Sequence, residues 1–495
     1  MTIQLNTTGT SSLEEEDCAD KSKSHYQKAR RAHWDKCSAH KKKTRRASSF
    51  YHKLLHNHYR FLIPEGLKVL EVGCGHGDLL ASLKPCLGIG IDFSYQMVKT
   101  ASIKHPHLIF FEADAYEIAF KEKFDVIILS DLINDVWDVQ TIFAMLRKIT
   151  YNRTRIIINF YNNLWRIPLA MVRKLGLSVD VMEQNWFAPH DVFNLLYLSD
   201  FDVVSCTPKI LLPLPIPLLS GLFNRYLVNL SFFRGFALTN FLVARPIPDP
   251  KALLARAYAV SVIIPARNEA GNIEKIIQRI PDMGSFTEII FVEGNSTDNT
   301  YETIKQIINR FPDKNCNLYK QAGKGKGDAV RLGFEKAKGD ILMILDADMT
   351  VPPEDLIRFY DAIVSGKGEF INGVRLVYPR ENNAMRFLNI LGNKFFSYAF
   401  SKLLCQPIKD TLCGTKVLWK KDYQRLSKNR KYFGDFDPFG DFDLLFGAAK
   451  LNFKIAELPI RYRYRTYGNT NINRWQHGWL LLKMVFFAAK RIKFI

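Results

Sequence analysis

The sequence predicts an α/β protein built from two doubly wound domains. Short apolar runs that are typical of buried strands alternate with helical patterns of roughly 10–15 residues, and this alternation predicts a parallel sheet. The alternation occurs twice, and a segment with three prolines at 246–258 separates the two occurrences. The length of 495 residues also favours more than one domain.

The first alternation belongs to a domain expected at 50–247, after a disordered and basic lead-in at 1–49. Disorder is expected for its first 20 residues, and the basic residues from 21 on predict either a solvated helix or a contact with a negative membrane surface or a phosphorylated acceptor. Two apolar runs near the end of this domain are expected to pair antiparallel at the edge of the sheet, at 201–211 and 238–246. The parallel strands are expected at 67–72, 87–92, 107–114, 124–131 and 154–160.

The second alternation belongs to a domain expected at 259–495, after a linker at 248–258. Its first strands are expected within "AVSVIIPARNE", "TEIIFVEGNSTDNT" and "DILMILDADMT", and a glycine-rich loop, "GKGKGDAV", leads into a helix between the last two. Apart from this shared architecture, the two halves show no internal repeat.

Charge and cysteine content narrow the possible partners and compartments. Lys and Arg outnumber Asp and Glu by 69 to 49, which gives a net charge of +20 and favours an anionic partner. The eight cysteines are scattered without zinc-type spacing, so reduced thiols in a cytoplasm are expected. The polar, acidic first 20 residues do not resemble a signal peptide.

Two apolar segments raise the question of a membrane surface. Residues 211–223 are apolar but shorter than the roughly 18–20 residues of a spanning helix, so they predict either a buried helical subdomain or a surface that touches lipid. The C-terminal segment "RWQHGWLLLKMVFFAAKRIKFI" combines apolar residues, two tryptophans and a basic end. It is expected to form an amphipathic membrane-surface segment, although packing against the domain is the alternative.

Glycines and an aspartate mark the ligand edge of the first domain. Gly73, Gly75 and Gly77 follow the first strand, where glycine lets the backbone turn tightly and approach a ligand. Asp92 ends the second strand, where a carboxylate can bind both hydroxyls of a ribose. The G-x-G-x-G spacing differs from the G-x-G-x-x-G of dinucleotide dehydrogenases, which are the competing interpretation.

With "VLEVGCGHGDLL", "GIDFS", "FEADA" and "FDVIILSDLIN" in order, residues 50–247 resemble the class I S-adenosylmethionine-dependent methyltransferases, which have a Rossmann-like fold. The methyl acceptor is not identified, but "NFYNNLWRIP" at 159–168 and "NWFAPHD" at 185–191 are candidate pocket segments, with His190 as a possible base. The resemblance implies that S-adenosylmethionine is bound by Glu71, Gly73, Gly75, Gly77, Asp92 (ribose), Asp114 (adenine) and Ser130–Leu132, including Asp131 (methionine end).

Two carboxylates follow a buried strand of the second domain in a D-x-D pattern. Asp346 and Asp348 are two residues apart, so they point the same way on an extended chain and repel unless a cation such as Mg²⁺ or Mn²⁺ binds them. A divalent cation at this edge suits a diphosphate leaving group. The candidate nucleotide-sugar residues at neighbouring strand ends are Pro265, Arg267, Asn268, Glu269, Glu293, Asp298, Lys326 and Asp328.

In this register, residues 259–495 resemble the family 2 glycosyltransferases, which have a GT-A fold. The stretches "LDADMTVPPEDL", "INGVRLVYP", "KDTLCGTKVLWKKDY" and "LPIRYRYRTYGNTNI" are most similar to dolichyl-phosphate mannose synthases and other polyprenyl-phosphate glycosyltransferases. The resemblance implies inversion at the anomeric carbon and contact of Arg375 and Lys416 with the acceptor phosphate. Relatives often have two Asp where Glu293-Gly294 stands here, so the nucleotide is not identified.

The chemistry of the acceptor is left open between two classes. A lipid phosphate is already anionic and needs cations, whereas a sugar hydroxyl needs a base such as Asp410, Asp441 or Asp443. We favour the lipid phosphate. Nearby aromatic residues in "GDFDPFGDFD" are suited to stacking on a sugar, which keeps the glycan acceptor as the alternative.

The whole chain is therefore expected to be a bifunctional enzyme, cytoplasmic and peripheral on the inner face of the membrane. It would transfer a sugar to a lipid phosphate or glycan and methylate an acceptor of the same pathway. The alternatives are a glycosyltransferase with a regulatory or degenerate methyltransferase domain, and a methyltransferase that modifies nucleic acid. No nucleic-acid partner is expected, because no RNA-binding motif is recognised and a glycosyltransferase is fused.

Overall fold

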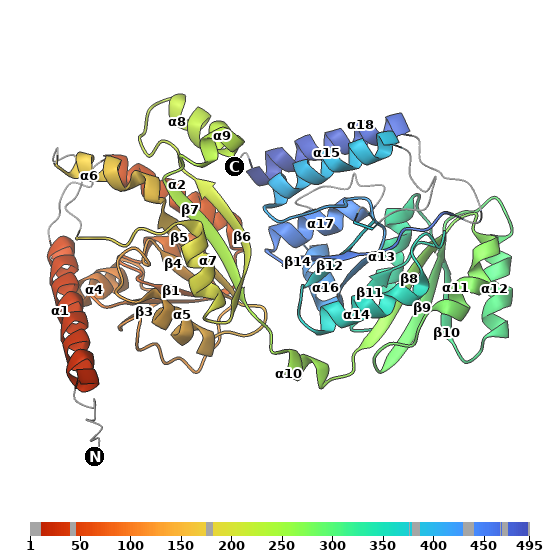
Figure 1. Ribbon diagram of the computed structural model, residues 1–495, viewed down its shortest axis with the longest axis horizontal. Coiled ribbons are helices and arrows are strands. Elements are labelled where there is room, and N and C mark those ends of the chain that lie inside the picture. The colour runs from red at the N-terminus through yellow and green to blue at the C-terminus, as the bar shows by residue number, and fades with distance from the viewer. Residues whose placement is uncertain are drawn as a thin grey trace, which may run out of the picture. The chain divides into compact units, whose positions relative to one another are not determined.

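The computed structural model describes residues 11–39, 46–174, 182–375, 377–378, 387–428, 440–465, 467 and 474–493 (Figure 1). The chain divides into two compact units, Met1–Ile247 and Pro248–Ile495. Within the described residues, each unit contains one mixed sheet of seven strands.

The sheet of the first unit has the strand order β3-β2-β1-β4-β5-β7-β6. The five neighbouring strands β3, β2, β1, β4 and β5 pair in parallel. Strand β7 pairs antiparallel with both β5 and β6. The two late apolar runs therefore do form an antiparallel edge, as predicted. The strands are β1 (Lys68–Val72), β2 (Leu87–Asp92), β3 (Ile109–Glu112), β4 (Val126–Ser130), β5 (Arg155–Tyr161), β6 (Phe201–Lys209) and β7 (Thr239–Pro246).

Helices cover both faces of this sheet and form two apolar cores. Helix α2 (Arg46–Leu62) buries Tyr51, Leu55 and Tyr59, which recur every four residues and so lie on one helix face. The other helical elements are α3 (Asp78–Ser82), α4 (Tyr95–Lys104), α5 (Val139–Lys148), η1 (Asn163–Trp165), α6 (Arg166–Lys174), α7 (Pro189–Tyr197), α8 (Leu219–Gly221), η2 (Leu222–Tyr226), η3 (Leu227–Asn229) and α9 (Ser231–Arg234).

The lead-in is helical where the structure describes it, which differs from the disorder expected for the first 20 residues. Residues 1–10 and 40–45 lie outside the described part of the chain, but Ser11–Ala39 form helix α1 and α2 starts at Arg46. Local composition favoured a solvated helix after residue 20 but did not reveal its contacts, because the described side chains of α1 find their partners in loops about 60 to 150 residues further along the chain. Tertiary contacts thus order a segment that is polar by composition.

The sheet of the second unit has the strand order β10-β9-β8-β11-β13-β12-β14. It is parallel except for β13, which pairs antiparallel with β11 and β12. The strands are β8 (Ala259–Ala266), β9 (Phe286–Glu293), β10 (Asn315–Lys320), β11 (Ile341–Ile344), β12 (Phe370–Val374), β13 (Lys416–Trp419) and β14 (Ile455–Pro459).

Two apolar cores hold the second unit together, and α15 packs beside α18 over one of them (Figure 1). The rings of Phe400 on α15 and Phe446 on α17 stack with their centroids 5.4 Å apart. The helical elements are α10 (Pro250–Leu254), η4 (Ala270–Asn272), α11 (Ile273–Arg279), α12 (Thr300–Arg310), α13 (Lys326–Lys336), η5 (Pro353–Asp355), α14 (Leu356–Val364), α15 (Phe387–Leu404), α16 (Lys420–Lys428), α17 (Asp441–Lys450), α18 (Arg474–Ala488) and η7 (Ala489–Lys493).

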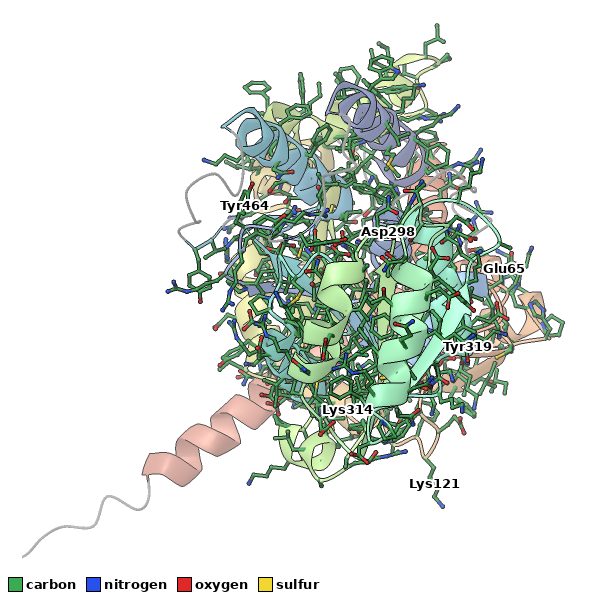
Figure 2. All side chains as sticks on the ribbon, turned by 90° about the vertical axis from the view of Figure 1, so that its right-hand side faces the viewer. Glu65, Lys121, Asp298, Lys314, Tyr319 and Tyr464 are labelled. Carbon is green, nitrogen blue, oxygen red and sulfur yellow. The ribbon has the colours of Figure 1, made fainter. Side chains whose placement is uncertain are left out.

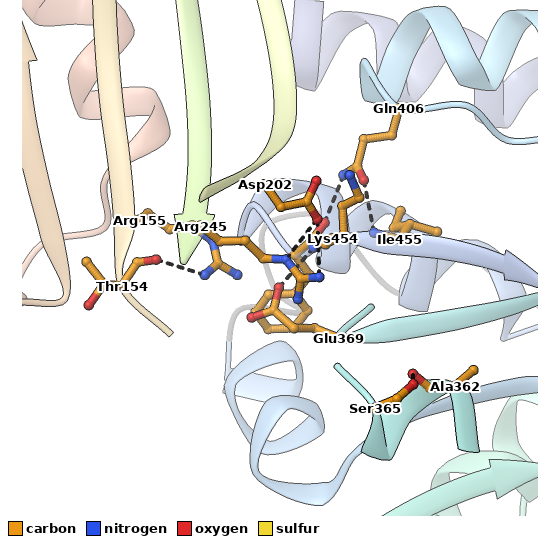
Figure 3. Close-up of polar contacts among 11 residues, drawn as sticks. Thr154, Arg155, Asp202, Arg245, Ala362, Ser365, Glu369, Gln406, Lys454 and Ile455 are labelled. Carbon is orange, nitrogen blue, oxygen red and sulfur yellow. Dashed lines mark hydrogen bonds and ion pairs between the residues drawn. The ribbon is translucent and has the colours of Figure 1, made fainter. Parts of the chain in front are cut away.

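Buried polar side chains connect the loop after α15 to the edge of the second sheet (Figure 3). The Gln406 amide donates to the carbonyl of Phe453 at 2.8 Å and accepts from the backbone N–H of Ile455 at 2.9 Å. Glu369 accepts from the N–H of Lys454 at 2.9 Å. These bonds help to hold β14 beside β12 at the edge of the sheet.

The expected linker at 248–258 contains the short helix α10. Its formation has a local cause, because Asp249 accepts a hydrogen bond from the N–H of Lys251 at 2.9 Å and Pro250 occupies the first helical position. None of the helices in the described ranges is both long and apolar enough to cross a membrane.

Candidate functional sites

The glycine loop of the first unit is built as a ligand-binding turn. Gly73, Gly75 and Gly77 have φ angles of 74°, 50° and 74°, which favour glycine. A Cβ added to Gly75 would meet no atom within 4 Å, so open space lies beside its backbone. A Cβ on Gly77 would lie 2.5 Å from the Phe110 ring. The loop is thus packed on one side and open at Gly75.

Asp92 lies directly against this loop. One carboxylate oxygen accepts the N–H of Gly75 at 2.9 Å, and the other accepts the N–H of Ser94 at 3.0 Å. Burial raises the pKa of Asp92, and these two bonds oppose the shift by stabilising its ionised form. The structure therefore brings Asp92 and the glycine loop together, and both remain candidates for S-adenosylmethionine.

Glu71 occupies a different position in the same region. It is buried, and its carboxylate accepts the backbone N–H of Leu80 at 3.1 Å, within helix α3. Burial raises the pKa of Glu71 to about 8. This geometry suits a residue that connects the start of α3 to β1 and so shapes the cofactor loop.

Asp114, the expected adenine contact, is connected to helix α1. Its carboxylate accepts the N–H of Tyr116 at 3.0 Å and the Gln27 amide at 3.1 Å. Helix α1 also contacts the loop after β2, where the Ser94 hydroxyl donates to Asp35 at 2.5 Å.

Asp135, in the loop after β4, receives two further contacts from α1 that the sequence analysis missed. It accepts the Trp34 indole N–H at 2.8 Å and forms an ion pair with Arg30. Helix α1 therefore touches the loops after β2, β3 and β4, which are the loops that carry the predicted cofactor residues. No sequence motif marks these contacts, because they join residues about 100 positions apart.

Asp131 is the centre of a hydrogen-bond network at the end of β4. Its φ of 54° is unusual for a residue other than glycine. The Tyr51 hydroxyl donates to it at 3.1 Å, and the Asn159 amide donates at 2.5 Å while accepting from Tyr59 at 2.7 Å. Burial raises the pKa of Asp131 to about 7. Ser130 pairs with Asn159 across the sheet, so both predicted residues lie at this strand end.

In the candidate pocket segment at 185–191, Asn185 and Trp186 lie near the end of β4 and β5, whereas His190 does not. Asn185 donates to the carbonyl of Val136 at 2.6 Å, and the Trp186 ring lies 6.3 Å from that of Tyr161. His190 is exposed at the start of α7, with its ring 5.4 Å from Phe193. The geometry thus favours Trp186 over His190 as a lining residue.

In the second unit, each carboxylate of the D-x-D pair faces a cation. Asp346 forms an ion pair with Lys326 at 2.6 Å, and Asp348 forms one with Arg465 at 2.8 Å. Asp348 also accepts the N–H and hydroxyl of Thr350 at 3.1 and 2.7 Å. Gly414 lies so close that a Cβ there would overlap Asp346. The loop around Gly414 therefore forms one wall of this carboxylate site.

Three cations influence Asp346. Burial by itself would raise the pKa of Asp346, but Lys326, Lys416 and Arg375 outweigh it and lower that pKa. Lys416 is fully buried at the start of β13, and its ammonium donates to the carbonyl of Cys413. The two predicted phosphate-binding residues thus lie near the D-x-D pair.

Arg375 and Asp410 form a buried pair with two parallel hydrogen bonds. The guanidinium donates to the two carboxylate oxygens at 2.7 and 2.8 Å, and the N–H of Leu412 donates to Asp410 at 3.0 Å. Burial tends to raise the pKa of Asp410, but Arg375 outweighs it and lowers that pKa. This arrangement favours a positioning role for Asp410 over the base role considered from the sequence.

The other two candidate bases are placed less completely. The side chain of Asp441 lies outside the described residues, and Asp443 is half-buried in the first turn of α17. Gly440, which precedes this helix, packs on Gly327 so tightly that a Cβ would lie 2.6 Å from its Cα. The start of α17 thus meets the start of α13, which bears Lys326.

The expected nucleotide-sugar residues lie on loops that are hydrogen-bonded to each other. Asn268 (φ 58°) accepts the N–H of Thr297 at 2.8 Å, and Glu293 accepts the N–H of Ser296 at 2.5 Å. Asp298 accepts the N–H of Thr300 at 3.0 Å at the start of α12 (Figure 2).

The remaining expected donor residues are placed as follows. Asp328 accepts the N–H of Gly323 at 3.0 Å. Pro265 pairs with Val292 in the sheet, and the neighbouring Arg267 is exposed. The loops after β8 and β9 and the start of α13 therefore frame one edge of the sheet, the edge that ends in Asp346.

Arg465 is a site residue that the sequence analysis missed. It bridges Asp348 and Glu269, whose carboxylate lies 3.1 Å away. Burial raises the pKa of Glu269 to about 7 despite this contact. The run "RYRYR" at 461–465 was the available signal, but only the fold shows which of its arginines meets the carboxylates.

The carboxylates of Asp346 and Asp348 suit a hard cation that takes its remaining ligands from substrate and water. Among the residues that the structure describes, no group of three or more His, Cys, Asp or Glu side chains could hold a metal. Asp346 and Asp348 offer the oxygen ligands that Mg²⁺ and Mn²⁺ prefer, and this pair leaves further positions for phosphate and water.

Each unit matches a different protein family. Residues 69–151 match the family model described as a methyltransferase domain, and residues 261–427 match family 2 of the glycosyl transferases. Both families are enzymes, and the predicted fold class, a Rossmann-like methyltransferase fold followed by a GT-A fold, is confirmed.

The second domain is similar to curated proteins of lipid-linked sugar transfer. A dolichol-phosphate mannosyltransferase of Pyrococcus furiosus is 38% identical over 220 residues, which are 43% of this chain and 59% of that protein. The glycosyltransferase AglJ of Haloferax volcanii is 27% identical over 234 residues, 47% of this chain and 72% of that protein. The match to the Pyrococcus protein thus covers less than two thirds of it.

Solved structures are similar to each unit at low identity. A magnesium protoporphyrin IX methyltransferase from Synechocystis has a TM-score of 0.27 and 19% identity, and covers 40% of this chain and 81% of its own. A glucosyl-3-phosphoglycerate synthase from Mycobacterium tuberculosis, with Mn²⁺ and uridine diphosphate, has a TM-score of 0.36 and 18% identity, and covers 49% and 81%.

Proposed function

We propose that the second unit transfers a sugar from a nucleotide-sugar to the phosphate of a polyprenyl or related lipid, with inversion at the anomeric carbon. The observation that carries this proposal is the cluster of Lys326, Arg375, Lys416 and Arg465 around the D-x-D carboxylates. Such a cluster can bind both a donor diphosphate and an acceptor phosphate.

Asp346 and Asp348 would hold Mg²⁺ or Mn²⁺, which supplies charge neutralisation for the leaving diphosphate. Lys326 and Arg465 already lie against these carboxylates and are placed to donate to phosphate oxygens. Arg375, fixed by Asp410, and Lys416 would bind the acceptor phosphate, which is anionic without a base.

The engagement of Asp410 by Arg375 supports a phosphate over a hydroxyl acceptor. A hydroxyl would need a free carboxylate to take its proton, and Asp443 or Asp441 would have to serve. A glycan acceptor is therefore the second candidate. The names of three relatives refer to dolichol, dolichyl or undecaprenyl phosphate, which agrees with the first candidate.

A thermal-shift screen with UDP-, GDP- and dTDP-sugars, each with and without Mn²⁺, tests the donor site. One donor is expected to raise the melting temperature only with Mn²⁺, because a ligand stabilises the state that it binds. Asp348→Ala should abolish the shift. Asp313→Ala, an exposed carboxylate in the turn before β10 at the opposite edge of the sheet, is the matched control and should retain it.

For the first unit we propose S-adenosylmethionine-dependent methylation of an acceptor in the same glycan pathway. Open space beside Gly75, the Asp92 carboxylate and the Asp131 network support cofactor binding. A degenerate or regulatory domain is the alternative: cofactor binding without any methyl transfer would favour it. Salt-dependent retention of RNA would instead favour the nucleic-acid alternative.

We also propose that the protein works at the cytoplasmic face of a membrane without spanning it. The net charge of +20 suits an anionic surface, and Trp479 and Phe486 on α18 are exposed. Lys483 lies 5.7 Å from the Trp479 ring, so apolar and cationic groups share this helix. Scattered free cysteines agree with a reducing compartment.

A further inference from the structure

A second apolar surface lies on the first unit, far in sequence from α18. It is formed by residues 163–174 and 211–236, which we call the apolar crest. The two segments are joined, because the Trp165 indole donates to the carbonyl of Phe236 at 2.9 Å and Asn162 donates to that of Gly235 at 2.9 Å. Figure 1 shows α6, α8 and α9 on the same side of the unit.

Two polar side chains of the crest are buried, although many of its apolar side chains are exposed. Ser220 is buried and donates to the carbonyl of Ile216 at 2.8 Å. Asn224 is also buried, accepts the N–H groups of Leu211 and Leu212 at 2.8 Å and donates to the Leu212 carbonyl at 2.7 Å. This polarity is the reverse of that expected for a segment that faces only water.

The outer side chains of the crest are large and strongly exposed. Leu218 is 93% exposed, Phe232 75% and Ile167 72%, and Leu164, Met171 and Phe236 are also exposed. Leu218 also adopts φ 62°, a strained conformation for leucine. Exposed apolar groups gathered in this way mark a surface that another phase or partner covers.

The charge around the crest has one sign. Arg166 and Arg225 are exposed and Arg234 is half-exposed. The sequence contains no Asp or Glu at 139–179 or at 203–248. An apolar surface with a basic rim and no acidic residue in its segments complements an anionic bilayer better than a protein partner of mixed charge.

Packed aromatic side chains join the crest to the end of β4, where Asp131 lies. Trp165 and Tyr161 pack on the apolar core that contains Tyr51, and the Tyr51 hydroxyl donates to Asp131 at 3.1 Å. The Tyr161 ring lies 6.2 Å from that of Tyr51. Aromatic side chains thus connect the crest to the strand end where the methionine part of the cofactor is expected.

We infer that the apolar crest docks the first unit on an anionic lipid surface, and that the methyl acceptor is carried by that surface. The second half of this inference rests on the proposed methyltransferase function, whereas the docking does not. The first unit would then reach its substrate by its own membrane contact and would not depend on α18 for it.

Vesicle co-sedimentation of the full chain tests the docking. The background is Trp479→Asp with Phe486→Asp, which removes the apolar contact proposed for α18. In that background, adding Leu218→Asp and Phe232→Asp should lower the partition coefficient on phosphatidylcholine–phosphatidylglycerol vesicles by about tenfold or more. The matched control adds Ile103→Asp and Tyr197→Asp, which are 74% and 69% exposed elsewhere on the unit, and should change the partition coefficient little.

Equal partitioning of the crest and control variants would overturn the docking inference. A crest that covers a second copy would show as a change of oligomeric state in sedimentation velocity, without a change in vesicle binding. A crest that covers the second unit would show as a loss of thermal stability in the crest variant without vesicles. Either result would also overturn it.

Cofactor binding separates this inference from the proposed function. The crest variants should bind S-adenosylmethionine as the unmodified protein does, measured by calorimetry. If the crest variants lose vesicle binding relative to the control while the unmodified protein binds no cofactor, the methyltransferase proposal fails and the docking stands. If methyl transfer in a lipid extract is unaffected by the crest variants, the acceptor half of the inference fails.

Discussion

At the scale of residues, the second site is defined by opposite charges held at close range. Lys326 and Arg465 lie on the carboxylates that the sequence assigned to a metal, and Arg375 is fixed by Asp410. The D-x-D pair was predictable, because two residues on one extended chain determine their own geometry. Arg465 was not, because 117 residues separate it from its partner Asp348.

The Arg375–Asp410 pair makes a quantitative prediction about stability. Asp410→Asn should cost about 3–5 kcal/mol in the free energy of unfolding of the second unit, because a buried guanidinium loses its counter-charge. The control is Glu354→Gln, which breaks the Arg279–Glu354 pair of similar geometry but with a 54% exposed carboxylate. That control should cost about 1 kcal/mol or less in chemical denaturation.

The pH dependence of this contribution has a definite sign. Arg375 keeps the pKa of Asp410 below its unfolded value, so the stabilisation is complete above the unfolded pKa and is lost as the pH falls through the folded pKa. The difference in unfolding free energy between Asp410→Asn and the unmodified protein should therefore shrink in acid. A difference that is independent of pH would contradict the buried ion pair.

Asp131 makes a prediction of opposite sign. Its pKa of about 7 is raised, so the folded protein holds a proton that the unfolded chain releases above about pH 4. Stability from this group is therefore present at low pH and falls as the pH rises toward 7. The ionised carboxylate should in turn favour the cationic methionine end of S-adenosylmethionine.

Calorimetry on either side of this pKa checks the prediction. The affinity for S-adenosylmethionine should rise as the pH increases through about 7, and Asp131→Asn should flatten this dependence. Asp191→Asn, at the start of α7, is the control and should leave the pH profile as it is. An unchanged profile in Asp131→Asn would remove Asp131 from the cofactor site.

At the scale of elements, the sequence predicted what depends on local pattern. The parallel strands with acidic ends and the antiparallel pair β6–β7 follow from apolar runs and their spacing. Strand β13 is only four residues long and antiparallel between parallel neighbours, so no pattern marked it, although it carries Lys416. The contacts of helix α1 were missed because they join it to distant loops that its own sequence does not indicate.

Helix α1 makes a prediction about cofactor binding. Its contacts with Ser94, Asp114 and Asp135 place it on the loops that are expected to bind S-adenosylmethionine. Cofactor binding should therefore slow hydrogen exchange in residues 22–36 as well as in the glycine loop. Slowed exchange in the glycine loop alone would show that α1 is not coupled to the site.

At the scale of the whole molecule, the two units have separate sheets, cores and candidate sites. The sequence could predict this organisation, because each alternation of strands and helices is complete in itself. It could not predict the outward-facing side chains of 211–236, since an apolar run reads the same whether it is buried or exposed. The burial of Leu211, Val228, Ser220 and Asn224 in the structure shows which side faces in.

Separate sites predict separable activities. Asp92→Ala should weaken S-adenosylmethionine binding, by about tenfold or more if its carboxylate holds the ribose hydroxyls. Sugar transfer by that variant should stay unchanged, and Asp348→Ala should show the converse pattern. Calorimetry and a sugar-transfer assay on both variants check this. Loss of both activities in either variant, with the fold retained, would show that the units are coupled.

The central claim is that the second unit transfers a sugar to a lipid phosphate. Its most direct test uses a labelled form of the nucleotide-sugar that raises the melting temperature, and measures transfer of the label to a polyprenyl phosphate in detergent. The matched acceptor is the polyprenol without phosphate. With Mn²⁺, label should enter the lipid phase with the phosphate and not with the alcohol, and both Asp348→Ala and removal of the metal should abolish it. Equal labelling of the alcohol, labelling of a saccharide instead, or normal transfer by Asp348→Ala would contradict the account.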